Sequence, residues 1–333
     1  MKTIFSRVCV LLFMCVWVSN ASAQYMTNFS VLEVEDEDFE MVINLTVSDL
    51  LSTFNKAQYD KKTPQQIKDQ LLQCNLTAEA ADVISKLWAD CPFVCMDEDI
   101  VEGMVKQPSG GYQIRNIHLI MKPIEGVSKD VSWKKYQEGV ISLDDEGKVT
   151  NFHLALDPEL YLSVLGSARA VEDIERRMLI LEYVERFRNA YNLKDMPFLE
   201  QIYSDDALII TGKVVTTKKA DGANEQKIAY TKQSKREYLD RLAGVFSRNS
   251  RINVTFNEIK VVRHPVNPDF YGVTLLQGWE TNNYSDVGWL FLLWDFTDPE
   301  APQIHVRTWQ PTEYNHQPVN VDEEVFTIDD FDI

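Results

Sequence analysis

Two residues that could transfer a proton lie on either side of a short predicted turn. Asp295 belongs to a strand predicted over Val287–Thr297, and His305 belongs to the next predicted strand, Gln303–Gln310. Facing residues of an antiparallel hairpin approach closely, so the carboxylate and the imidazole could meet across it. Such a pair can act as general acid and base when burial shifts its pKa values. The alternative is structural, because strand ends readily carry Asp and His305 could lie on a solvated face.

Strand periodicity indicates what would surround this pair. His305 is predicted to share a face with Arg307 and Trp309, whereas Asp295 shares a face with three large apolar residues, Trp289, Phe291 and Leu293. Asp295 and His305 are the candidate catalytic residues. The candidate ligand pocket takes in Tyr183, Trp279, Trp289, Asp295, His305 and Arg307. Its aromatic members could equally belong to the core, and the alternation does not reveal which face lines a pocket.

Other catalytic and metal-binding patterns are missing. The sequence has no serine-histidine-aspartate signature, no HExxH, no phosphate-binding glycine loop and no EF-hand spacing. Cys91 and Cys95 are not spaced as CxxC and have no nearby His, so with Cys74 they are expected to form a disulfide or remain buried thiols. We therefore expect no metal and no cofactor.

The first 23 residues predict export. A basic start is followed by the short apolar run Val8–Val18 and by Ala21-Ser22-Ala23, which fits cleavage near Ala23. The apolar run is too short to span a membrane, and no later segment is long and apolar enough, so no transmembrane segment is expected. The mature protein is expected in the periplasm or outside the cell.

Charge is distributed unevenly along the 333 residues, whose net charge is −18. We divide the remainder of the chain into an acidic N-terminal segment (24–47), two α+β domains (48–166 and 167–311) and an acidic C-terminal tail (312–333). The acidic ends are interpreted as solvated tails or as partner-binding segments, since apolar residues in the last one could add a strand to another sheet. The acidic surface excludes nucleic acid as a partner.

Helices followed by strands are predicted in the first domain. The helices are expected at Asp49–Tyr59, Pro64–Gln73 and Thr77–Asp90. A strand at Tyr112–Met121 is followed by a hairpin whose turn is Asp144-Asp145-Glu146-Gly147, a pattern typical of a tight turn between strands. The domain is therefore predicted to be α+β.

The second domain has the order helix, helix, strand, strand, helix and four strands. Its most apolar part, Tyr271–Trp309, is predicted to form adjacent antiparallel strands at the sheet centre. The stretches FRNAYNLKDMPFLEQIYSDDALII and SKREYLDRLAGVF, with this final meander, resemble the nuclear transport factor 2-like superfamily, particularly its SnoaL-like and ketosteroid-isomerase-like branches. The resemblance implies a cone in which a curved antiparallel sheet wraps around helices and leaves a pocket at its open end. It also implies that Tyr183 or Tyr191 could be an oxyanion donor.

Members of this superfamily include enzymes, ligand binders and protein-binding modules, so the fold alone does not decide the function. The first domain could be a degenerate second copy, because its hairpin resembles the one in Tyr271–Trp309. We expect an exported, non-catalytic binding or interaction protein whose cone pocket takes a small apolar ligand or a protein partner. The alternative is an isomerase or lyase that uses Asp295 and His305. A homodimer could form through the cone sheet.

Overall fold

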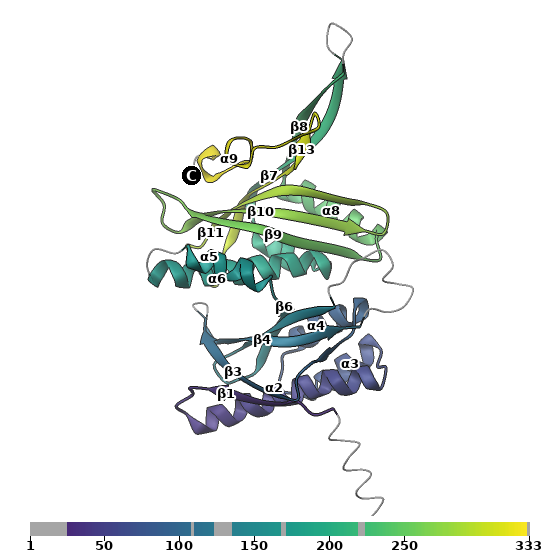
Figure 1. Cartoon of the computed structure of the whole chain (residues 1–333), viewed down its shortest axis with the longest axis vertical. Helices are drawn as coiled ribbons and strands as arrows, with labels where there is room; N and C mark the ends of the chain where they lie inside the picture. Colours follow the sequence, from purple (N-terminus) through teal and green to yellow (C-terminus); the bar gives the residue numbers. More distant parts are fainter. Residues whose placement is uncertain (1–24, 108–109, 123–134, 168–170, 219–223, 332–333) are drawn as a thin grey trace, which may run out of the picture. The chain divides into compact units, whose positions relative to one another are not determined.

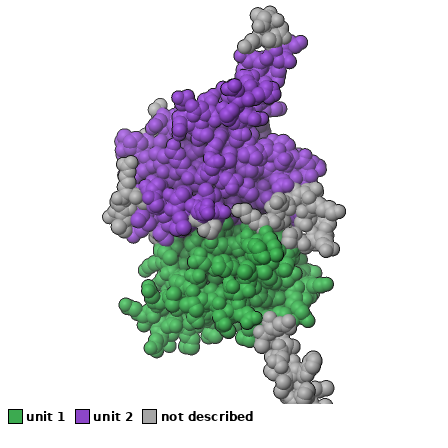
Figure 2. Space-filling view, viewed as in Figure 1, with its two compact units in different colours: residues 1–128, 132–155 green, residues 129–131, 156–333 purple. Residues whose placement is uncertain are grey.

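The computed structural model describes residues 25–107, 110–122, 135–167, 171–218 and 224–331, so the predicted signal peptide lies outside the described residues. The described chain divides into two compact units, shown in Figure 2, with the boundary between Ala155 and Leu156. The sequence placed this boundary after Gly166. Helix α5 (Pro158–Gly166) consequently belongs to the second unit rather than the first. Both units are α+β, as predicted.

Unit 1 contains the predicted helices and hairpin. Its helices are α2 (Glu37–Tyr59), α3 (Pro64–Leu71) and α4 (Ala78–Asp90). Its strands lie in one mixed sheet (Figure 1): β1 (Asn28–Leu32), β2 (Phe93–Cys95), β3 (Asp99–Lys106), β4 (Tyr112–Met121), β5 (Tyr136–Leu143) and β6 (Val149–Leu154). The turn between β5 and β6 requires a positive φ of 79° at Gly147, which a glycine adopts without strain.

The acidic segment 24–47 is folded rather than a solvated tail. It contains β1, which pairs in parallel with β3 and buries Phe29 and Val31. It also contains the first turns of α2, where the Asp36 side chain accepts hydrogen bonds from the backbone N–H groups of Asp38 and Phe39. Carboxylates are favourable at a helix N-terminus because the helix dipole is positive there. The run of acids therefore lies at the start of α2. The helix was predicted to begin only at Asp49.

This interpretation of α2 predicts a stability change at its N-cap. Asp36→Ala removes the side-chain acceptor for two N–H groups and should lower the free energy of unfolding of unit 1 by about 1 kcal/mol. Urea unfolding followed by far-UV circular dichroism measures the loss. Glu35→Ala is the matched control, because it removes the same charge from an exposed neighbour that is not the cap. Equal losses in both variants would contradict the capping role.

Unit 2 has the predicted order of elements. After α5 come α6 (Val171–Asn192) and α7 (Met196–Ile202), and α8 (Lys235–Arg248) follows the first two strands. The strands are β7 (Tyr203–Lys218), β8 (Asn224–Ser234), β9 (Ile252–Arg263), β10 (Phe270–Thr281), β11 (Ser285–Asp295) and β12 (Gln303–Pro311). They form one sheet in the order β8-β7-β12-β11-β10-β9.

The predicted meander is the centre of this sheet. Strands β10, β11 and β12 are antiparallel neighbours, as expected for Tyr271–Trp309. The last strand of the meander, β12, lies beside the first strand of the unit, β7, and the two run in the same direction. The sheet is therefore mixed rather than wholly antiparallel.

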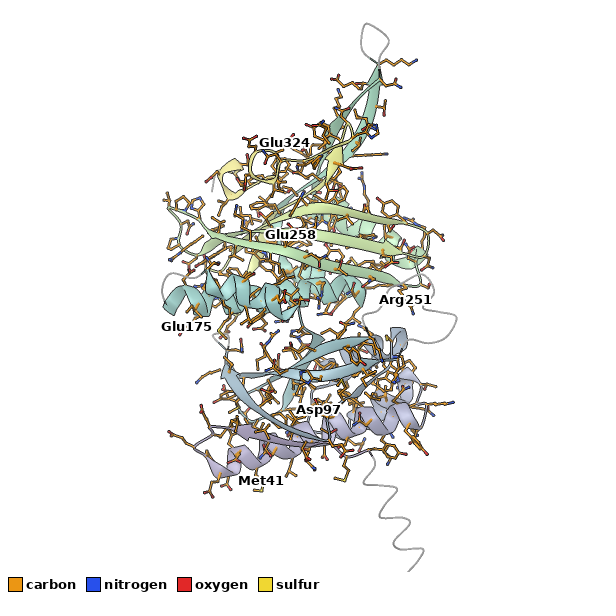
Figure 3. The ribbon with its side chains drawn as sticks, viewed as in Figure 1. Met41, Asp97, Glu175, Arg251, Glu258 and Glu324 are labelled. Atoms are coloured by element: carbon orange, nitrogen blue, oxygen red, sulfur yellow. The ribbon has the colours of Figure 1, made fainter. Side chains whose placement is uncertain are left out.

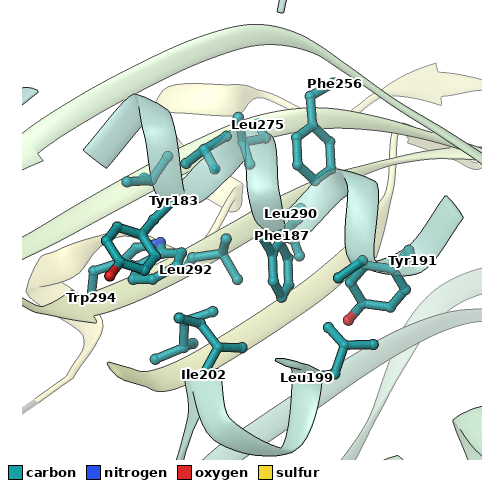
Figure 4. Close-up of a cluster of buried hydrophobic side chains, with 14 of the residues drawn as sticks. Tyr183, Phe187, Tyr191, Leu199, Ile202, Phe256, Leu275, Leu290, Leu292 and Trp294 are labelled. Carbon is teal, nitrogen blue, oxygen red and sulfur yellow. The ribbon is translucent and has the colours of Figure 1, made fainter. Parts of the chain in front are cut away.

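The face of the sheet that packs against α6 carries the core of unit 2. Phe187 of α6 lies at its centre, fully buried among Tyr191, Phe256 and Trp294 (Figure 4). Alternate residues of β11, such as Leu290 and Leu292, point to this side. We call it the inner face. Its aromatic side chains fill the centre of the cone.

The opposite, outer face carries the C-terminal segment, which was predicted to be an acidic tail. Residues 312–331 form β13 (Glu313–Tyr314), β14 (Gln317–Pro318), α9 (Val321–Glu324) and a 3-10 turn at Ile328–Asp330 (Figure 1; Glu324 is labelled in Figure 3). Apolar residues between its acids are buried against the sheet. Val319 and Val325 pack against Trp289, and Ile328 packs against Phe291. The segment therefore covers its own sheet, and a homodimer through the sheet stays a prediction.

The two units share only part of their topology. Each has helices followed by an antiparallel meander, but the extra parallel strand joins a different end. In unit 2, β7 pairs with the last meander strand, β12, whereas in unit 1 β1 pairs with the first, β3. The tandem repeat is therefore not shown by the strand order and stays a prediction.

Candidate functional site

The structure brings Asp295 and His305 together on the outer face. His305 Nε2 lies 3.4 Å from Asp295 Oδ2, and His305 Nδ1 lies 3.7 Å from Asp206 Oδ1. The imidazole also contacts the ring of Phe270, at 5.6 Å between centroids. Phe270 belongs to the apolar cluster beneath the C-terminal segment. A site inside the cone therefore cannot contain this pair.

A β-bulge separates His305 from Arg307. Strand periodicity placed both on one face, but the register between β11 and β12 shifts. Leu293 pairs with Val306 and Trp294 pairs with Ile304, which leaves His305 as the extra residue. The bulge turns His305 outward and the Arg307 side chain inward.

Arg307 is buried on the inner face and forms no salt bridge with a described carboxylate, although its charge acts on Asp286. Only 6% of the residue is exposed, and its guanidinium carbon lies 5.0 Å from the centre of the Tyr238 ring. Its Nε has no hydrogen-bond partner, and none of the described Asp or Glu residues forms an ion pair with it. Its pKa is raised overall, because burial lowers it but the negative charge that the neighbouring tyrosines carry once ionised raises it more. The guanidinium therefore remains a cation inside the protein.

Three tyrosine hydroxyls form a hydrogen-bonded chain beside this cation. The hydroxyl of Tyr191 on α6 lies 2.9 Å from that of Tyr203, at the start of β7, and 2.7 Å from that of Tyr238 on α8. Burial raises the pKa of Tyr191 and of Tyr203 well above the usual value. Both hydroxyls therefore stay protonated and can donate hydrogen bonds.

We call Arg307 and the three tyrosines Tyr191, Tyr203 and Tyr238 the Arg307 cluster. Residues at the ends of β10 and β11 border it. Trp279 pairs with Asp286 across the two strands, and its ring lies 5.8 Å from the ring of Tyr191. Burial raises the pKa of Asp286, an effect that the hydroxyl of Tyr284 at 2.5 Å and the charge of Arg307 oppose. Gln277 is also buried here, and its Oε1 lacks a hydrogen-bond partner. The cluster thus combines aromatic rings with polar groups that are not fully satisfied.

The six predicted pocket residues lie in different places. Arg307 belongs to the Arg307 cluster and Trp279 borders it, and Asp295 and His305 form the outer pair. Trp289 lies beneath the C-terminal segment. The hydroxyl of Tyr183 donates to the backbone oxygen of Glu300 at 3.1 Å, away from the other tyrosines.

Tyr203 and Tyr238 were missed as site residues. Tyr238 stands first in the apolar stripe of α8, which indicated core packing, and Tyr203 lies where α7 gives way to β7. A hydroxyl-bearing aromatic at a position predicted to be buried is the signal that could have identified both, because a buried tyrosine hydroxyl requires a partner.

Metal and redox sites are not apparent in the described part of the chain. No group of three or more His, Cys, Asp or Glu residues there could hold a metal ion. No disulfide joins Cys74, Cys91 and Cys95 in the described structure, and burial raises the pKa of the Cys74 and Cys95 thiols. No helix among the described residues is long and apolar enough to cross a membrane.

Solved structures, but neither family models nor curated proteins, are similar to parts of this chain. No family model and no curated protein match the chain. Solved structures that match include an NTF2-like protein of Cytophaga hutchinsonii, with 13% identity over 40% of this chain and 97% of that one (TM-score 0.27). A proposed ketosteroid isomerase of Shewanella frigidimarina matches with 12% identity over 40% and 94% (TM-score 0.29). Bd1075 of Bdellovibrio bacteriovorus matches with 14% identity over 67% and 83% (TM-score 0.32). At these values no activity is carried over from them.

Proposed function

We propose that this chain is an exported, non-catalytic binding protein, and that the cluster around Arg307 takes a small ligand with an apolar, ring-containing body and one anionic group. The observation that carries the proposal is that Arg307 is only 6% exposed and forms no salt bridge with a described Asp or Glu residue, although its charge acts on Asp286. Taking an ion out of water costs several kcal/mol, and an opposite charge offsets this cost. A carboxylate on a bound ligand would supply that charge.

The neighbouring side chains fit the remainder of such a ligand. The rings of Tyr238 and Trp279 offer apolar surfaces for the ring of such a ligand. Export is supported by the predicted signal peptide, whose residues lie outside the described structure.

Calorimetric titration with benzoate and benzamide tests this proposal. The two probes have the same ring and similar size, but only benzoate is anionic. Benzoate should bind with one site per chain, and benzamide should bind at least about tenfold more weakly, since a hydrogen bond to a charged group contributes roughly 1.5–3 kcal/mol. Equal affinities of the two probes would contradict the requirement for a negative charge. If neither probe binds, the proposed site is wrong.

A second function, that of an isomerase or lyase, is favoured by the hydroxyl chain and by Asp286. Protonated, buried hydroxyls can stabilise an enolate oxygen, and a carboxylate of raised pKa can remove a proton. This alternative moves the acid–base role from Asp295 and His305 to Asp286 and Tyr191. It requires turnover of an enone or hydroxy-ketone that Tyr191→Phe reduces strongly and that Asp295→Asn leaves unchanged. Binding without turnover would exclude it for the compounds assayed.

A further inference from the structure

A groove of about 620 Å³ lies between the outer face of unit 2 and the C-terminal segment. Its floor is apolar and includes Leu208, Phe270, Leu293 and Val306. Phe326 and Phe331 of the C-terminal segment line the other side, where Phe331 stacks on Phe291 and Phe326 contacts Tyr230. The volume is within the range of small-molecule sites. Because the groove lies on the outer face, it is separate from the Arg307 cluster.

The groove is elongated across the strands. Its floor residues come from β8, β7, β12, β11 and β10, which are consecutive in the sheet. Adjacent strands lie about 4.8 Å apart, so four such spacings extend the floor over roughly 19 Å. The apolar part of the floor, from β7 to β10, covers three of these spacings, roughly 14 Å. This strip suits a long alkyl chain, and each buried methylene of such a chain contributes favourably.

Three side chains that can carry a charge line the groove: His305, Asp330 and Lys232. His305 is held between Asp295 and Asp206, and Asp330 accepts hydrogen bonds from the backbone and side chain of Thr327. Lys232 on the edge strand β8 is exposed and forms no ion pair with a described residue. The β8 end of the groove therefore has an ammonium group available for an anion.

We propose that this groove binds a single-chain amphiphile with an anionic head, of the long-chain fatty carboxylate class. The alkyl chain lies on the strip from Leu208 to Phe270, beneath Phe326 and Phe331, and the carboxylate meets the ammonium group of Lys232. The ligand contacts both the sheet and the C-terminal segment, so binding also stabilises the segment on the sheet.

Binding of myristate and of 1-tetradecanol, measured by displacement of a fluorescent fatty acid, tests the proposal. The wild-type chain should bind both, with one site each. Lys232→Met should weaken myristate binding by about threefold to fivefold, as for an exposed ion pair, and leave 1-tetradecanol unchanged. Lys213→Met is the matched control, because this exposed lysine of β7 does not line the groove. No myristate binding, or an equal effect of both lysine variants, would overturn the proposal.

Two further variants test the location. Val306→Phe narrows the floor and Phe331→Ala removes part of the cover, so each should weaken both ligands. Phe331 is half-buried and close to the chain end, so Phe331→Ala should fold. It therefore tests the location even if Val306→Phe does not fold. Arg307→Met should leave myristate binding unchanged. Loss of myristate binding in Arg307→Met would show that myristate binds at the Arg307 cluster. This result would overturn the proposal for the groove, whatever the result with benzoate.

Discussion

Arg307→Met is expected to weaken binding of an anionic ligand strongly while leaving the unliganded protein at least as stable as the wild type. Removing one partner of a buried ion pair typically costs 2–5 kcal/mol, so the affinity for benzoate should fall about 30-fold or more. Burying a cation that forms no salt bridge costs several kcal/mol, so its replacement with an apolar side chain of similar volume should not destabilise the unliganded protein. Titration with benzoate and urea unfolding measure the two effects.

Arg236→Met is the control for this charge change. Arg236 lies on α8, two residues from Tyr238, and its side chain is 92% exposed. Its replacement removes the same charge from the surface and should change neither quantity appreciably. A large destabilisation by Arg307→Met without loss of benzoate binding would indicate that Arg307 is a structural residue rather than a ligand-binding one.

Phe187→Ala is expected to produce the largest loss of stability. The ring is fully buried, and its centroid lies 5.0 Å from that of Tyr191 and 6.3 Å from that of Trp294 (Figure 4). The centroid of Tyr203 lies 6.0 Å away. Truncation of a buried phenylalanine leaves a cavity and costs about 3–5 kcal/mol. Urea unfolding followed by tryptophan fluorescence reports this loss, because Trp294 borders the cavity.

The same substitution should weaken benzoate binding, because Phe187 supports two of the three hydroxyl-bearing rings. Val266→Ala is the control, since Val266 is 85% exposed and its truncation should have little effect on stability. A loss below about 1 kcal/mol in Phe187→Ala would contradict the central position assigned to this ring.

The elements of the fold were largely predictable because their signals are local. Helices α3 and α4 begin within one residue of the predicted positions, behind the capping side chains of Thr63 and Thr77. Alternation located the three strands of Tyr271–Trp309. Parallel pairing of β7 with β12 was not predicted, because it joins residues about a hundred positions apart and has no local signal. The folded acidic ends were misread because charge was taken to indicate solvation, although β1 and the C-terminal segment bury the apolar residues between the acids.

The candidate site was less predictable because it depends on one bulge and on tertiary contacts. Periodicity cannot show that His305 is an extra residue in β12, and this single shift places Arg307 on the opposite face from His305. Tyr191, Tyr203 and Tyr238 come from three separate elements, so only packing brings their hydroxyls together. Arg307 and Trp279 were recognised as pocket candidates, but their shared location required the structure.

The most direct test of the central claim compares the thermal stabilisation that benzoate confers on the wild-type chain and on Arg307→Met. A ligand that binds only the folded state stabilises it by RT ln(1 + [L]/Kd), so the melting temperature rises with ligand concentration. We expect a concentration-dependent rise in the wild type, a smaller one with benzamide, and a strongly reduced one with benzoate in Arg307→Met. An equal rise in both proteins would contradict the assignment of Arg307 as the anion-binding residue.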